Sequence, residues 1–155
     1  MKKLICMILI FLNFSLNAKI SLLPYKNYLK INEINLVNVL LNEADTWIGT
    51  KYVWGGTSRK GIDCSAFVRN VYEKSLNIDL PRTSREQFKY TKQIDKNNIQ
   101  KGDLVFFLNS KGIHHVGIIY DKDKFIHVSS SRGVRIDSLN SGYWKDKKKK
   151  FCKII

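Results

Sequence analysis

The sequence predicts one α+β domain, because helical periodicity fills its first half and short strands fill its second. Apolar residues recur every three or four positions up to about residue 76. From residue 103 onward, short runs rich in β-branched and aromatic residues alternate with turn formers. The chain has 155 residues, of which 44% are hydrophobic, so it can bury one core but not two. We therefore expect helices packed on an antiparallel meander.

The first 18 residues have the pattern of a secretory signal peptide. Lys2 and Lys3 precede the apolar run LICMILIFLNFSL (4–16), and Ala18 supplies a small residue for cleavage. The apolar run is short for a spanning helix, although an uncleaved membrane anchor is the alternative. We predict that the mature chain begins near Lys19 and works in the periplasm or outside the cell, associated with the envelope.

The chain is strongly basic, with a formal net charge of +14. Excess positive charge attracts anionic partners, and outside the cytoplasm these are wall polymers and membrane surfaces. The basic residues are scattered apart from KDKKKK (145–150), which also fits a solvated tail, and no nucleic-acid-binding signature is present. An anionic cell-envelope surface is therefore a candidate partner. We expect that the protein does not bind nucleic acid. We expect a monomer.

The first predicted helix lies between Leu22 and about Gly49 and repeats its apolar residues at helical spacing. Those residues are Ile31, Ile34, Val37, Leu40, Leu41 and Ala44. We divide the mature chain into an N-terminal segment, 19–41, and a domain, 42–155. The stretch IGTKYVWGGTSRKGID (48–63) is rich in glycine and turn formers and is expected to be an irregular loop.

A second helix is predicted to begin within GIDCSAFVRN (61–70). Its apolar residues fall on one face, and they are Phe67, Val68, Val71, Tyr72 and Leu76. Asp63 is placed to cap the first turn, which puts Cys64 where unpaired N–H groups and the helix dipole lower the pKa of a thiol. The same N–H groups can stabilise an oxyanion. Cys64 is therefore a candidate nucleophile, with simple packing or a disulfide to Cys152 as alternatives.

The second half of the chain contains four short β-rich runs, which follow a helix start at TSRE (83–86). The runs are DLVFFL (103–108), HHVGIIY (114–120), KFIHVSS (124–130) and VRIDSL (134–139). The C-terminal KFCKII (150–155) is interpreted as a last strand or a core contact.

All three histidines lie in this β half. A cysteine nucleophile needs a nearby base, usually histidine, and a third group that orients the base. Alternation along a strand puts His114 and His115 on opposite faces, so only one of them can serve the site. A three-residue loop at 121–123 would place His127 opposite Gly117 and diagonal to His115, with the glycine leaving room for the two rings. A zinc site built from the cysteine and two histidines is an alternative, but no short ligand spacing supports it.

Several motifs, in order, resemble those of the NlpC family of bacterial cell-wall cysteine peptidases, most closely the small Gram-negative murein endopeptidases. The motifs are YVWGGTSRKGIDCSAFV, LPRTSREQ, KGDLVFF, HHVGIIY and FIHVSS, and the similarity runs from about Asn42 to Trp144. The resemblance implies a papain-like fold, in which the helix bearing the nucleophile packs on a central antiparallel sheet. It also implies a secreted enzyme that hydrolyses amide bonds in peptidoglycan peptide stems or cross-links, without a metal or organic cofactor.

The resemblance further assigns the site residues. It makes Cys64 the nucleophile, His115 the base and His127 the residue that orients the base. The residues it associates with the substrate are Tyr52, Asp63 and Ser65. The sequence departs from the family pattern at Ala66, where glycine is common, and at His114, which precedes the base. The alternative function is a non-catalytic cell-wall-binding module with an idle thiol, and acyl transfer by the same thiol is a third possibility.

Overall fold

The structure is a computed structural model, and it describes residues 30–154. The chain divides into two units, residues 1–36 and 37–155, and one helix with described residues 30–45 crosses this boundary. The predicted domain boundary at 41/42 falls inside that helix, and the predicted signal peptide lies outside the described residues. Among residues 30–154, no helix is both long and apolar enough to cross a membrane.

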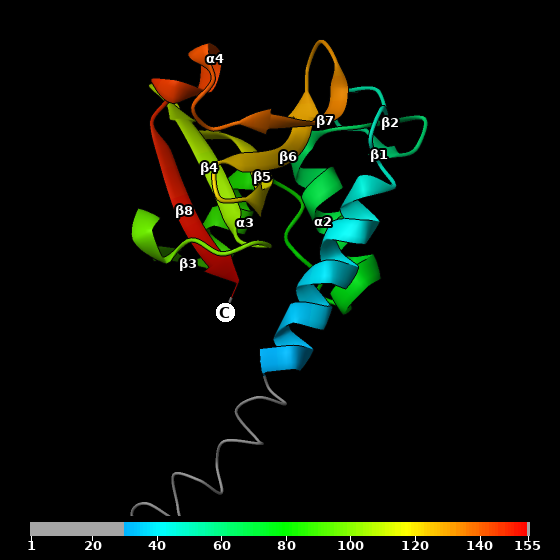
Figure 1. Cartoon of the computed structure of the whole chain (residues 1–155). Coiled ribbons are helices and arrows are strands. Elements are labelled where there is room, and N and C mark those ends of the chain that lie inside the picture. The colour runs from blue at the N-terminus through cyan, green and yellow to red at the C-terminus, as the bar shows by residue number, and fades with distance from the viewer. Residues whose placement is uncertain (1–29, 155) are drawn as a thin grey trace, which may run out of the picture. The chain divides into compact units, whose positions relative to one another are not determined.

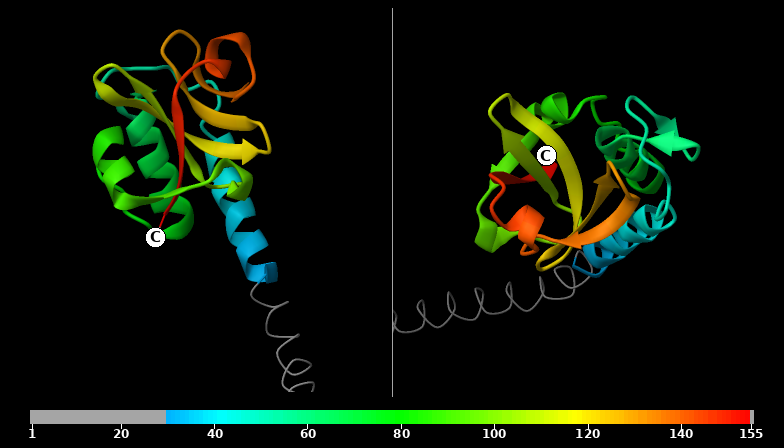
Figure 2. Two further views of the ribbon diagram at one scale, coloured as in Figure 1. Left: turned by 90° about the vertical axis from the view of Figure 1, so that its left-hand side faces the viewer. Right: turned by 90° about the horizontal axis from the view of Figure 1, so that it is seen from above.

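An antiparallel sheet forms the centre of the unit 37–155, as predicted, and it has six strands (Figure 1). The spatial order is β3-β8-β4-β5-β6-β7. The strands are β3 (Thr91–Ile94), β4 (Leu104–Asn109), β5 (Gly112–Asp121), β6 (Lys124–Ser129), β7 (Gly133–Ser138) and β8 (Lys149–Ile154). Strands β4 to β7 form the expected meander, and β8 returns from the C-terminal end to lie between β4 and β3. Figure 2 shows that the sheet is curved, so its strands wrap partly around the core.

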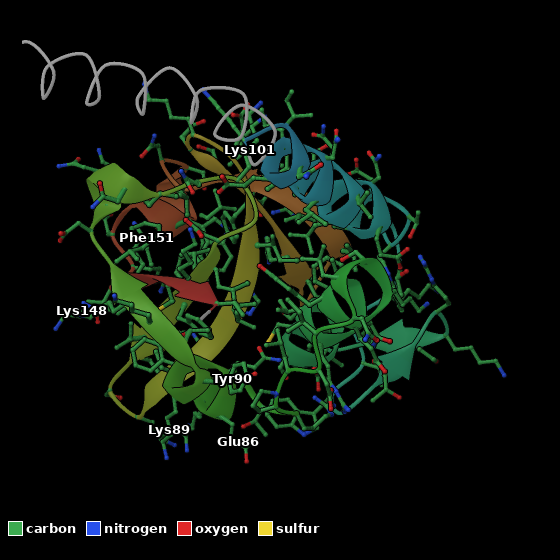
Figure 3. The ribbon with its side chains drawn as sticks, turned by 90° about the horizontal axis from the view of Figure 1, so that it is seen from below. Glu86, Lys89, Tyr90, Lys101, Lys148 and Phe151 are labelled. Atoms are coloured by element: carbon green, nitrogen blue, oxygen red, sulfur yellow. The ribbon has the colours of Figure 1, made fainter. Side chains whose placement is uncertain are left out.

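Helix α2 (Cys64–Leu76) packs against β5 and β6, and its predicted apolar face is buried except for Leu76, which is partly buried. Helix α3 (Ser84–Tyr90) packs against β5 and β3. Thr83 and Glu86 form a capping box at its start, as the TSRE motif predicts. Figure 3 shows Glu86, Lys89 and Tyr90 on the outer side of α3, whereas Gln87 is fully buried. The Gln87 side chain donates to the backbone oxygens of Ser65 and Pro81, each at 2.9 Å, and so ties α3 to the first turn of α2.

Both faces of the sheet are buried, because successive residues of one strand enter different core clusters. In β4, Leu104 and Phe106 join the cluster that contains α2, whereas Val105 and Phe107 join a second cluster. Trp144, from the short helix α4 (Gly142–Lys145), closes the second cluster. A strand buried on both faces reads as a continuous apolar run, which is why DLVFFL shows no alternation.

The β5–β6 hairpin has the predicted register but a different turn. Gly117 pairs with His127, as predicted. The predicted three-residue loop is wrong, because Asp121 pairs with Lys124 and only residues 122 and 123 form the connection. A bulge between Ile119 and Asp121 compensates for the shorter loop.

The segment 48–63 is more ordered than predicted. Strands β1 (Thr57–Ser58) and β2 (Gly61–Ile62) form a small hairpin, and Tyr52 bridges to Ile62. A Cβ atom added to Gly56 would lie 2.5 Å from the backbone oxygen of Gly61, so the second glycine of YVWGG is required by close packing of the backbone. The hairpin fixes the approach of the chain to Asp63 and the start of α2.

Candidate active site

One cavity of about 960 Å³ brings the predicted site residues together. Its walls come from the loop before α2, the first turn of α2, residues 82–84, strands β5 to β7 and the region of α4. All six predicted site residues line it, namely Tyr52, Asp63, Cys64, Ser65, His115 and His127. Tyr52 and His127, which are 75 positions apart in the sequence, thus line one cavity, because α2 packs against β5 and β6, the strands that carry the histidines.

Cys64 is the first residue of α2, as predicted. Asp63 caps the helix by accepting a hydrogen bond from the Ala66 N–H at 2.8 Å. Burial nevertheless raises the pKa of the Cys64 thiol to about 11, although backbone N–H groups of Val116 and Ser65 oppose the rise. The expected lowering of this pKa is not met, because loss of hydration outweighs the helix N-terminus. Cys64 is therefore a neutral thiol near pH 7.

His115 lines the same cavity as this thiol and is also neutral. The hydrogen bond from Val116 places the sulfur next to β5, directly after His115. The His115 ring stacks on Trp144, with ring centroids 5.4 Å apart and an interplanar angle of 16°. Burial lowers the pKa of His115 to about 3, and the charges of His127 and His114 act in the same direction. The unprotonated imidazole is therefore available as a proton acceptor.

The two predicted catalytic histidines are hydrogen-bonded to each other. Nε2 of His115 lies 3.0 Å from Nδ1 of His127, and the rings meet edge to face. Gly117 leaves the space for this contact, because an added Cβ would lie 2.7 Å from the Phe125 ring and 3.1 Å from Cβ of His127. The predicted role of the glycine is confirmed.

Replacing Gly117 by alanine is expected to cost about 1–3 kcal/mol of unfolding free energy, because the new methyl overpacks a buried site. The added Cβ would also lie 2.9 Å from the backbone oxygen of Ile126, which cannot move aside as a flexible side chain would. Urea unfolding measures the loss. The matched control is Gly142→Ala, since nothing lies within 4 Å of a Cβ at Gly142. Equal midpoints for the two variants would contradict this packing argument.

His114 does not follow the predicted alternation. It is exposed, yet it lines the same cavity as His115. In the β4–β5 pair Phe107 faces His115 and Leu108 faces Ile113, so His114 is the extra residue of a bulge. Simple alternation therefore fails at this position.

The Asp63 carboxylate is shared between the helix cap and an ion pair. Arg82 donates to it through both terminal nitrogens, at 2.6 and 3.1 Å, and the Ser65 hydroxyl donates to it at 3.0 Å. Burial pushes the pKa of Asp63 upward, but hydrogen bonds from Arg82 and the Ala66 N–H outweigh it and hold the pKa below its usual value. Tyr52 lies nearby, and burial raises the pKa of its hydroxyl, with smaller contributions from Cys64 and Asp63. Tyr52 therefore remains a hydrogen-bond donor.

Residues 49–153 match the NlpC/P60 family. The chain belongs to this family.

Relatives of this NlpC/P60 chain include bacterial endopeptidases. A probable endopeptidase of Haemophilus influenzae is 43% identical over 113 residues, which are 72% of this chain and 70% of that protein. The murein DD-endopeptidase MepS/murein LD-carboxypeptidase of Escherichia coli is 36% identical over 115 residues, which are 74% of this chain and 61% of that protein. The match thus spans about two thirds of these relatives.

Solved structures agree with the NlpC/P60 fold. A protein similar to a lipoprotein of the NLP/P60 family from Staphylococcus aureus is 32% identical, with a TM-score of 0.70 over 78% of this chain and 42% of that chain. A non-catalytic NlpC/p60 domain protein of Mycobacterium tuberculosis, RipD, is 17% identical, with a TM-score of 0.66 over 77% of this chain and 98% of that one. The fold is therefore shared by a protein without catalysis, and the site must carry the argument for chemistry.

Three residues of the NlpC/P60 site were not singled out from the sequence. Arg82 binds Asp63 and Ser65, Asp137 contacts His127, and Trp144 stacks on His115. Arg82 lies within the motif LPRTSREQ, and Trp144 lies at the end of the stretch that resembles the family. These positions were the only indication of the two residues in the sequence. Asp137 sits in an ordinary strand pattern, and only the pairing of β6 with β7 brings it to the histidine.

The structure bears on the two other roles predicted for Cys64, a disulfide and a metal site. Cys64 and Cys152 are both free, and Cys152 is fully buried in the core, so the disulfide alternative is wrong. Within the part of the chain that the structure describes, no group of three or more His, Cys, Asp or Glu side chains is arranged to hold a metal ion.

Replacing Asp63 by asparagine is expected to separate the two roles of this residue. Asparagine caps helices about as well as aspartate, so unfolding free energy should change by less than about 1 kcal/mol. Asparagine cannot hold Arg82 by a charged double contact, so we expect kcat/KM for peptidoglycan fragments to fall about tenfold. Asp63→Ala removes the cap as well and should cost about 1 kcal/mol more in a urea titration. An unchanged kcat/KM in Asp63→Asn would show that the ion pair between Asp63 and Arg82 does not contribute to activity.

Proposed function

We propose that the protein is a peptidoglycan endopeptidase that hydrolyses amide bonds in peptide stems or cross-links, with Cys64 as nucleophile. One observation carries the proposal: Cys64, His115 and His127 line a single cavity in an NlpC/P60 chain. The names of the relatives support the same activity, because one is a murein DD-endopeptidase and another a probable endopeptidase.

The proposed reaction starts from a neutral thiol and a neutral imidazole. His115 takes the proton of Cys64 while the sulfur attacks the carbonyl carbon of the amide. The carbonyl oxygen becomes an oxyanion, which the N–H groups of the first turn of α2 stabilise. His115 then gives its proton to the leaving amine, and a thioester remains on Cys64. Water attacks the thioester with His115 as base, which releases a carboxylic acid and restores the thiol. No step requires a metal or an organic cofactor.

We further propose that Tyr52, Asp63 and Ser65, together with Arg82, hold the peptide stem. Arg132 and Arg135 also line the cavity, and guanidinium groups suit the carboxylates of an acidic peptide. Trp54 and Tyr143 line this cavity and are 87% and 66% exposed, so their aromatic side chains offer apolar surface to an extended substrate.

The proposed location is the periplasm or the cell exterior, in association with the envelope. This proposal rests on the signal-peptide pattern of residues 1–18, which would leave an N-terminal segment at 19–41 before the peptidase domain at 42–155. The net charge of +14 supports attraction to an anionic envelope surface. We propose that the protein acts there as a monomer and without nucleic acid.

The decisive experiment compares the native protein with Cys64→Ser on purified peptidoglycan digests that contain cross-linked dimers and monomers. Mass spectrometry identifies the products. Conversion by the native form alone supports the proposal, and the product masses identify the bond that is cut. If neither form converts a substrate but both bind sacculi, the protein is a wall-binding module. A product that carries an added amine would show acyl transfer. Thiol labelling is a weaker test, because a pKa of about 11 slows alkylation of Cys64 near pH 7 in an enzyme and in a binding module alike.

A further inference from the structure

The hydrogen-bonded histidine pair continues to a carboxylate. Asp137 lies in β7 opposite Phe125 of β6, and its Oδ2 atom is 3.1 Å from Nε2 of His127. His127 is almost fully buried, with 1% of its side chain exposed, and 12% of the Asp137 side chain is exposed. Cys64, His115, His127 and Asp137 all line the cavity.

Two further donors fix the Asp137 carboxylate. Arg135 donates from Nε to Oδ1 at 2.7 Å, and Trp144 donates from Nε1 to Oδ2 at 3.3 Å. Burial pushes the pKa of Asp137 upward, but contacts with His127, Trp144 and Arg135 outweigh it and hold the pKa below its usual value. Asp137 is therefore ionised near pH 7 and can only accept hydrogen bonds.

These contacts determine which nitrogen of each ring carries a proton. Burial lowers the pKa of His127, so its ring is neutral near pH 7. An ionised Asp137 requires a proton on Nε2 of this ring, so its Nδ1 atom is bare. A bare Nδ1 on His127 can only accept, so Nε2 of His115 must carry the proton of their shared hydrogen bond. A neutral His115 with its proton on Nε2 has a bare Nδ1. The opposite arrangement would place a proton on Nδ1 of His115 and block this nitrogen as a base.

We propose that Asp137 is a positioning residue that sets the tautomers of His127 and His115 and so leaves Nδ1 of His115 free to accept the Cys64 proton. The proposal rests on the proposed peptidase function. It adds Asp137 as the fourth residue of the series Cys64–His115–His127–Asp137. During attack, one proton moves from the sulfur to Nδ1 of His115. The resulting imidazolium donates through Nε2 to His127, whose own Nε2–H points at the Asp137 carboxylate, so the new charge is stabilised along the chain.

Trp144 contacts two members of this series, His115 and Asp137. Its ring stacks on His115, and its N–H donates to Asp137. The same side chain therefore limits rotation of the base and orients the carboxylate that fixes its tautomer. This arrangement explains why a tryptophan is built into the wall of a polar site.

Nuclear magnetic resonance of the full chain labelled with ¹⁵N-histidine tests the proposal directly. Ring nitrogens with and without a proton differ clearly in chemical shift, and only three histidines contribute. We expect the wild-type spectrum near pH 7 to show His127 and His115 both protonated on Nε2 and bare on Nδ1. A proton on Nδ1 of either residue would overturn the proposal. This measurement uses no substrate, so it remains decisive even if the protein proves not to be a peptidase, and even if a variant does not fold.

The matched variants are Asp137→Asn, Asp137→Glu and Asp79→Asn. Asp79 pairs with Arg69 on the surface, so its substitution removes one carboxylate charge outside the site. In Asp137→Asn we expect loss of the single tautomer at both histidines and a fall in kcat of about 10- to 100-fold, with KM changed less than about threefold. We expect Asp137→Glu to recover part of the kcat and the wild-type tautomers, and Asp79→Asn to match the wild type. Unchanged tautomers and kcat in Asp137→Asn would refute the role of Asp137, whereas an inactive wild type with the expected tautomers would refute only the peptidase function.

Discussion

Replacing Cys64 by alanine is expected to abolish hydrolysis of peptidoglycan fragments, with a fall in turnover of at least about 10⁴-fold. The reason is chemical, because no other side chain at the cavity offers a sulfur that can form the thioester. Cys64 lies at the first position of a helix capped by Asp63, and alanine is compatible with that position. We therefore expect the variant to fold and to keep its affinity for sacculi. The measurement is product formation from cross-linked dimers, read by mass spectrometry together with a pull-down of sacculi.

The matched control is Cys152→Ala, which removes the other described thiol from the core of β8. We expect this variant to lose stability, because a buried side chain leaves a cavity, but to keep turnover at a temperature where it is folded. Comparable turnover by native protein and Cys64→Ala would exclude the thiol mechanism. No turnover by either form, with sacculi still bound by both, would leave the wall-binding function.

The parts of the site that depend on local sequence could be predicted. The cap at Asp63, the start of α2 at Cys64 and the capping box at Thr83 each involve residues within three positions of one another. The contact between His115 and His127 was also predictable, because period two and one hairpin register determine it. The turn itself was not, since a two-residue connection with a bulge produces the same register as a three-residue loop.

The remaining parts depend on contacts between distant segments. Asp137 reaches His127 only because β7 pairs with β6, and Trp144 reaches His115 from a four-residue helix whose sequence carries no helical period. The short edge strand β3 was missed because TKQI has neither length nor alternation. The pKa of Cys64 was predicted with the wrong direction, because the helix terminus is visible in the sequence and the burial of the sulfur is not.

The second large effect concerns the base. Replacing His115 by glutamine is expected to lower kcat at pH 7 by about 10³-fold, because the thiol loses its proton acceptor. Glutamine retains a donor for the bond to His127, so the neighbouring structure should persist. Attack by Cys64 would then require a thiolate that forms without help. Since the pKa of this thiol is about 11, the residual rate should rise about tenfold for each pH unit between 7 and 10. Wild-type kcat should show no such rise.

Measurements below pH 7 also distinguish the wild type from His115→Gln. Burial lowers the pKa of His115 to about 3, so wild-type kcat should stay constant as the pH falls from 7 to 5, where an ordinary histidine would become protonated.

The stability of the wild type, unlike its kcat, should fall over the same pH range. The unfolded chain binds a proton at His115 below about pH 6.5 and the folded chain does not, so unfolding free energy falls by up to about 1.4 kcal/mol per pH unit between 6.5 and 3. His115→Gln lacks this group and should lose less stability than the wild type between pH 7 and pH 5 in urea titrations. The exposed neighbour provides the control for activity, since His114→Gln keeps the base at His115 and should keep the wild-type kcat at pH 7. A His115→Gln variant with wild-type kcat, or with a rate that does not depend on pH above 7, would show that another group accepts the Cys64 proton.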